Sequence, residues 1–149
     1  MAEKMANVGD VYPTILHLLA TFSTRIDRGE GVADLFHEDA IFITPKGEVR
    51  TCDAIAALFD TRAAHQAREG RLGRHIVTNV IVEARADGGF EVQSTLLALV
   101  MEPGAGQSSM LVGDQSDIVN LAQDGTLKFS RRELAPAMHF ALSPIAPAT

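Results

Sequence analysis

The pattern of apolar and polar residues divides the chain into an early helical part and a later part made of long strands. After Pro13 and again after Thr51, apolar residues recur every three or four positions, which is the spacing of an amphipathic helix. Further along, β-branched residues and two-residue alternation dominate, and turns rich in glycine separate the segments. Early helices followed by strands that are joined by hairpin turns predict an α+β fold.

Three helices are expected before the long strands, after a loose arm at residues 1–11. The first begins at Pro13, which suits an initial helical turn, and ends near Gly29, which can adopt a left-handed cap. A short second helix is expected at residues 32–36, and Thr51 or Asp53 can cap the third. The buried stripes of the two longer helices consist of Ile15, Leu18, Leu19, Phe22, Ile26, Ile55, Leu58 and Phe59.

The strands are expected to form one curved sheet. They cover residues 40–44, 71–83 (with β-branched residues densest at 76–82), 90–101, 110–121 and 127–134. Turn signals lie between them at residues 45–47, 87–89, 104–106 and 123–125. We therefore expect a strongly curved antiparallel sheet wrapped around the N-terminal helices, which makes a cone with a central pocket.

Two strands carry polar residues on a face that also holds apolar ones. Strict alternation places His75 and Asn79 on one face with Val77 between them. If this face lines a cavity, His75 can transfer protons and Asn79 can orient a ligand; if it faces solvent or a neighbouring sheet, both are ordinary polar strand residues. Asp114 and Ser116 likewise share one face, and they either line the pocket or mark a β-bulge or a sheet edge.

Composition and charge narrow the classes of function. With 149 residues and an apolar fraction of 46%, the chain is long enough for one domain, residues 1–149, with a hydrophobic core. The net charge of −6 without a basic cluster argues against nucleic acid and against anionic membrane surfaces as partners. The single cysteine, Cys52, rules out an internal disulfide, fits a reducing compartment and is interpreted as a packed thiol.

Targeting and cofactor signals are weak or missing. No stretch is apolar enough for a membrane helix, and no run of signal-peptide type precedes Asp10, so we expect a cytoplasmic protein. His17, His37, His65 and His139 show no metal-ligand spacing with acids or with Cys52, which predicts no metal. No glycine-rich phosphate loop follows a strand, so we expect no nucleotide or other cofactor.

Taken together, these segments resemble the SnoaL-like branch of the nuclear-transport-factor-2-like superfamily, whose fold is an α+β cone. The resemblance covers nearly everything from Ile15 to Leu134. It rests on the helix end at residues 26–29, the Leu-Phe-His-Glu-Asp-Ala passage at 35–40, the helix start at 53–55, the strand at 74–80 and the closing strand at 124–132. The branch includes polyketide cyclases, scytalone dehydratases and hexachlorocyclohexane dehydrochlorinases, so the resemblance implies a cofactor-independent lyase or isomerase.

The resemblance to the dehydrochlorinases also implies a set of site residues. Their catalytic histidine lies in a His-x-x-x-Asn strand, which matches His75 and Asn79, and its aspartate partner matches Asp27. Their arginine lies in a strand that resembles Lys-Phe-Ser-Arg-Arg here and points to Arg132. The helper lysine of that group falls near Phe22, which we expect to line the pocket as an apolar residue.

Alternatives remain open for these residues. Asp27 lies well off the apolar stripe of its helix, and it could instead bond local backbone at the helix end. Arg131 and Arg132 point to opposite faces of a strand, so only one of them can enter the cone. His75 and Asp27 would form a general base, and Arg132 would stabilise a developing anion.

Oligomer formation is expected from the C-terminal segment and from the sheet. Residues 135–149 contain three prolines among apolar residues, and they either cover the mouth of the cone or pack on another subunit. A sheet face with Leu97, Leu99 and Val119 would also need a partner, so a homodimer or homotrimer is expected. The alternative function is a non-catalytic module that binds a small hydrophobic molecule or supports assembly, like the small subunit of ring-hydroxylating dioxygenases.

Overall fold

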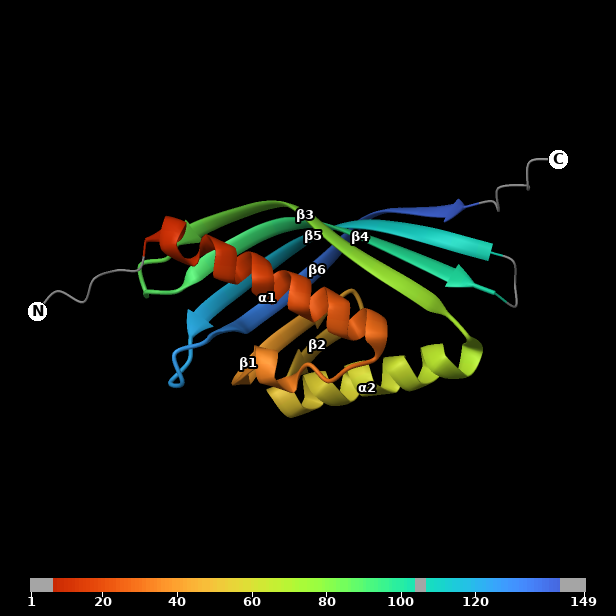
Figure 1. The fold of residues 1–149 in the computed structure, drawn as a ribbon, viewed down its shortest axis with the longest axis horizontal. Helices are drawn as coiled ribbons and strands as arrows, with labels where there is room; N and C mark the ends of the chain where they lie inside the picture. Colours follow the sequence, from red (N-terminus) through yellow and green to blue (C-terminus); the bar gives the residue numbers. More distant parts are fainter. Residues whose placement is uncertain (1–6, 104–106, 143–149) are drawn as a thin grey trace, which may run out of the picture.

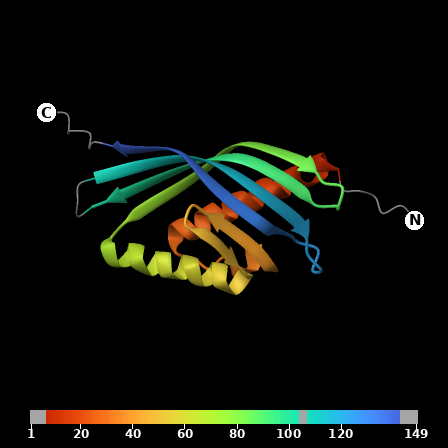
Figure 2. The ribbon, with the colours of Figure 1, turned by 180° about the vertical axis from the view of Figure 1, so that it is seen from behind.

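A computed structural model describes residues 7–103 and 107–142, in which two long helices pack on one side of a six-stranded sheet (Figure 1). The prediction of an α+β fold is confirmed. Seen from behind, α1 lies on the far side of the sheet and α2 runs below it, beside β1 and β2 (Figure 2). No helix in these two ranges is long and apolar enough to cross a membrane.

Helix α1 (Val8–Arg28) begins earlier than expected, so the prediction of a loose arm is wrong for its last residues. Asn7 caps the helix by accepting a hydrogen bond from the backbone N–H of Gly9, and Pro13 lies inside it. The extra turn forms because Val8, Val11 and Tyr12 pack on the core. At the other end Gly29 adopts a left-handed φ of 69°, as predicted for the cap.

The middle of the chain forms a short helix, a hairpin and the second long helix. A 3₁₀ turn η1 (Ala33–Leu35) leads into β1 (Phe36–Thr44), which starts earlier than predicted. After the turn at residues 45–46 the chain forms β2 (Gly47–Arg50), a strand that the sequence did not indicate. Helix α2 (Cys52–Glu69) follows, and its cap is Thr51, whose hydroxyl oxygen accepts from the N–H of Ala54 at 3.3 Å.

The sheet has the order β2-β1-β6-β5-β4-β3, and it is completed by β3 (Leu72–Ala84), β4 (Phe90–Glu102), β5 (Gln107–Leu121) and β6 (Leu127–Leu142). β6 pairs with β1 in parallel, so the prediction of a purely antiparallel sheet is wrong for this pair. Residues 135–142 pair with β5, so they belong to β6 and do not form a separate tail. The predicted turn at residues 104–106 and the rest of the C-terminal segment, residues 143–149, lie outside the described residues.

Phenylalanines fill the space between the helices and the sheet. The ring of Phe22 on α1 packs edge-to-face against Phe36, Phe59 and Phe129, with centroid distances of 5.9, 5.3 and 5.9 Å. All four side chains are buried in one cluster. Aromatic pairs of this geometry add stability beyond the burial of their area. The interior of the cone is therefore packed around Phe22.

A β-bulge interrupts β3 and changes which residues face inward. Asn79 has a left-handed φ of 53°, and the pairing with β4 shifts between Thr78 and Ile81. Val80, next in the chain, packs on the core although strict alternation would turn it outward, while Asn79 is exposed. The prediction that Asn79 shares the face of His75 is therefore wrong.

Candidate functional site

The last turn of α1 meets the first residues of β3, and there it joins Asp27 to His75. The Oδ1 atom of Asp27 lies 2.6 Å from Nδ1 of His75, and Oδ2 accepts the backbone N–H of His75 at 3.0 Å. The side chains are only 10% and 24% exposed, so the pair is largely shielded from water. The two residues lie 48 positions apart in the chain, and the packing of α1 across β3 brings them together.

The Asp27 carboxylate determines which ring nitrogen of His75 carries the proton. A carboxylate only accepts hydrogen bonds, so Nδ1 must donate to it and Nε2 of a neutral ring keeps its lone pair. The second hydrogen bond, from the His75 backbone, holds the carboxylate in place. This arrangement leaves Nε2 as a proton acceptor and can stabilise the imidazolium that forms when it takes a proton.

His75 lines a partly enclosed cavity of about 90 Å³ between the end of α1 and the face of α2. The cavity is smaller than the engineered cavity of about 150 Å³ that takes up benzene. The guanidinium of Arg62 lies 5.2 Å from the ring centroid of Phe59, and burial lowers the pKa of Arg62. The lining consists of Ile26, Gly29, Glu30, Phe59, Arg62, Ala63, Gln66 and His75.

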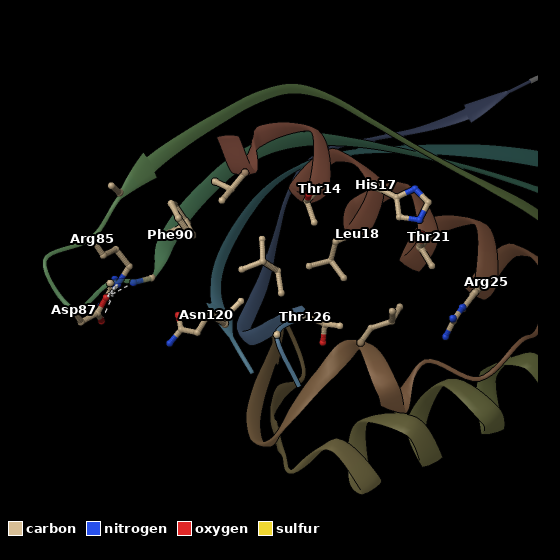
Figure 3. A pocket seen from close by; sticks show the side chains of 18 residues that line it. Thr14, His17, Leu18, Thr21, Arg25, Arg85, Asp87, Phe90, Asn120 and Thr126 are labelled. Atoms are coloured by element: carbon tan, nitrogen blue, oxygen red, sulfur yellow. Dashed lines mark hydrogen bonds and ion pairs between the residues drawn. The ribbon is translucent and has the colours of Figure 1, made fainter. Parts of the chain in front are cut away.

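A much larger groove of about 880 Å³ lies elsewhere, along α1 and the β3–β4 and β5–β6 turns (Figure 3). Its polar residues include Arg85 and Asp87, which form an ion pair at 3.0 Å, and Arg25. Neither Asp27 nor His75 lines it. We locate the candidate site at the smaller cavity, because the proton-transfer groups are there and size alone carries no chemistry.

Arg132 points into the interior, as predicted, whereas Arg131 forms an ion pair with Glu133 nearer the surface. Arg132 is 1% exposed, and its guanidinium carbon lies 4.2 Å from the ring centroid of Phe22 and 4.5 Å from that of Phe129. It lines neither cavity described above. Arg132 therefore packs on the phenylalanine cluster instead of lining the cavity of the dyad, and Phe22, which we expected to line the pocket, lines neither cavity.

Asp117 accompanies Arg132 in the interior. Its Oδ1 atom lies 3.4 Å from Nε of Arg132, and Asp117 is fully buried. Burial raises the pKa of Asp117 to about 6, because the cost of desolvating the carboxylate outweighs the attraction of Arg132 and Arg131. None of the side-chain nitrogen and oxygen atoms of the pair, Oδ1 and Nε included, has a hydrogen-bond partner among the described residues.

Asp114 and Ser116 face away from the interior, so the prediction that they line the pocket is wrong. Asp114 is exposed, and the hydroxyl of Ser116 accepts from the side-chain amide of Gln93 at 3.3 Å on the outer face. The inward residues of β5 are instead Gln115 and Asp117, which have the same parity as the buried Val119. Val119 is buried, so the expectation that it lies on an exposed sheet face is wrong. The face of β5 that turns inward is therefore the one opposite to that predicted.

Arg62 and Gln66 also line the cavity, although nothing in the sequence of the polar half of α2 indicates a site. Their spacing of four residues places both on one helix face, and this face meets His75 in the fold. Burial and the adjacent Asp53 raise the pKa of the Cys52 thiol, which disfavours its nucleophilic thiolate form. Among the described residues, no cluster of three or more His, Cys, Asp or Glu side chains could hold a metal ion.

Comparison with known proteins adds a family and a set of structural relatives. The solved structures include a protein of Novosphingobium aromaticivorans provisionally named a scytalone dehydratase, at 24% identity and a TM-score of 0.74, covering 93% of this chain and 95% of that one. ActVI-ORFA of Streptomyces coelicolor is 21% identical with a TM-score of 0.68, covering 85% and 96%. A hexachlorocyclohexane dehydrochlorinase is 17% identical with a TM-score of 0.71, covering 93% of each chain.

These identities show a common fold, and no protein of curated function matches the chain significantly. The family follows from a different comparison. A model of the SnoaL-like domain matches residues 11–133, which include Asp27 and His75 as well as the interior pair of Asp117 and Arg132. Because the match extends over most of the chain, from α1 into β6, the protein belongs to the SnoaL-like domain family.

Proposed function

We propose that this protein is a cofactor-independent lyase or isomerase in which His75, oriented by Asp27, removes a proton from a carbon atom of a small, largely apolar substrate. The observation that carries the proposal is the contact of 2.6 Å between Nδ1 of His75 and Oδ1 of Asp27 beside a cavity. Relatives of the same fold named as a dehydratase or a dehydrochlorinase lend support.

The chemical step follows from the free Nε2 atom. Nε2 accepts the proton, and the electron pair of the broken C–H bond either forms a double bond and expels a leaving group from the neighbouring carbon, or moves onto a carbonyl oxygen as an enolate. The first route is an elimination, which releases water or another acid once His75 returns its proton. The second is an isomerisation, in which His75 returns the proton to a different carbon.

Hydrogen–deuterium exchange at carbon tests this base without knowledge of the substrate. Small ketones are incubated with the protein in deuterated buffer, and loss of the proton signal next to the carbonyl is followed by NMR. A positioned general base contributes about 10²–10⁴ in rate, so we expect His75→Ala to lower the exchange rate by at least about 100-fold. His17→Ala is the matched control, because His17 is exposed on α1 away from the dyad. Equal rates for the wild type and His75→Ala would refute the proposal.

A second candidate is a non-catalytic module that binds a small molecule, and the packed interior favours it. The phenylalanine cluster fills the cone, and the cavity beside His75 has only about 90 Å³. A thermal-shift screen of small hydrophobic compounds separates the two functions. Compounds that stabilise the wild type and His75→Ala equally, without exchange at carbon, would favour the binding module.

A further inference from the structure

Arg62 brings a positive charge into the cavity of the dyad. It is the one arginine or lysine among the residues that line this cavity, and no carboxylate lies within ion-pair distance of it in the described part of the chain. Its guanidinium rests on the ring of Phe59, at 5.2 Å from the centroid. Contact with an aromatic face directs a cation without neutralising it. Arg62 is therefore free to bind an anion.

Neither carboxylate near the cavity, Asp27 or Glu30, forms an ion pair with Arg62. Asp27 accepts two hydrogen bonds from His75. Glu30 lines the cavity as well, and its carboxylate lies 4.0 Å from the guanidinium of Arg28 in a partly exposed ion pair. Next to Arg62, one turn along α2, Gln66 offers an amide that can donate further hydrogen bonds. The wall formed by α2 thus presents donors, opposite a histidine that accepts a proton.

We propose that Arg62 binds a carboxylate group, the one charged group of an otherwise apolar and compact substrate, and that this contact holds the substrate with a carbon-bound proton facing His75. The inference rests on the proposed base for its chemical meaning, but anion binding can be measured without turnover. A cavity of about 90 Å³ limits the enclosed part of the ligand to a few atoms beyond the carboxylate. Arg62 would supply a positive charge beside the dyad, where neither Phe22 nor Arg132 lines the cavity.

The test uses propionate and its neutral analogue propionamide as probes. Binding is followed by the NMR shift of the His75 ring in the wild type, in Arg62→Gln and in Arg68→Gln, a control exposed on the same helix outside the cavity. We expect propionate to bind Arg62→Gln at least tenfold more weakly than the wild type, and to bind Arg68→Gln as tightly as the wild type. Propionamide should bind all three proteins with the same affinity.

Unchanged propionate affinity in Arg62→Gln would overturn the inference, and so would equal affinity of the wild type for the two probes. The outcome is independent of the test of the base. If His75→Ala keeps its exchange rate while Arg62→Gln loses propionate, the anion site stands and the base falls. If the reverse is found, the base stands without the anion site.

Discussion

The exchange of Asp27 for asparagine gives the sharpest prediction for the dyad. Both carboxylate oxygens accept hydrogen bonds from His75, at 2.6 Å from Nδ1 and at 3.0 Å from the backbone N–H. The amide of asparagine has one accepting oxygen and one donating nitrogen. Whichever way it turns, one of the two donors of His75 meets an NH₂ group, so one hydrogen bond is lost or the ring must change its tautomer.

The substitution should lower both the rate of proton transfer and the free energy of unfolding. If the amide oxygen keeps the backbone contact, Nδ1 must accept, the proton moves to Nε2, and the base is in the wrong tautomer. The equivalent change in a serine protease triad lowers kcat by about 10⁴, and we expect a loss of at least about 10² here. Loss of a hydrogen bond to a charged group should also lower the free energy of unfolding by roughly 1.5–3 kcal/mol.

Three measurements on Asp27→Asn check this reasoning. Nitrogen NMR of the His75 ring reports the tautomer, exchange at carbon reports the base, and urea unfolding reports stability. His17→Ala again serves as the control for exchange. A variant that keeps an unprotonated Nε2 and exchanges within threefold of the wild type would refute the role assigned to Asp27.

The remaining predictions concern the interior and the stability of the fold. Burial raises the pKa of Asp117 from 3.8 to about 6, so the folded state keeps this proton to a higher pH than the unfolded state does. The free energy of unfolding should therefore fall by on the order of 3 kcal/mol as the pH rises from about 4 to about 6. Urea unfolding at several pH values measures this fall, which should be absent in Asp117→Asn. Arg132→Met should lower the free energy of unfolding by about 3–5 kcal/mol, because it leaves a buried carboxylate unpaired. The double variant Arg132→Met/Asp117→Leu should recover most of this loss, and denaturant unfolding measures both. Tyr12→Phe should cost about 0.5–1.5 kcal/mol, since the Tyr12 hydroxyl donates to the carbonyl of Val80 at 3.1 Å; an unchanged melting temperature would show that this bond contributes nothing.

The sequence alone determined most of the elements, though not β2, because their signals are local. Helical spacing located both long helices, Gly29 marked the end of the first, and turn residues separated the long strands. It also pointed to His75, Asp27 and Arg132 through the resemblance to the family. Local signals have limits, however: the bulge at Asn79 and the inward parity of β5 depend on how neighbouring strands pair, so Asp114 and Ser116 were assigned to the wrong side.

The tertiary structure decided which of these residues act together. Asp27 lies off the apolar stripe of its helix, and it reaches His75 only because α1 packs across β3. Arg62, in a polar stretch of α2, gains its proposed role because that helix lines the same cavity. Arg132 enters the interior as expected, but it packs on phenylalanine rings and does not line the cavity of the dyad. Such juxtapositions depend on the angles at which elements pack, and residue order along the chain does not encode those angles locally.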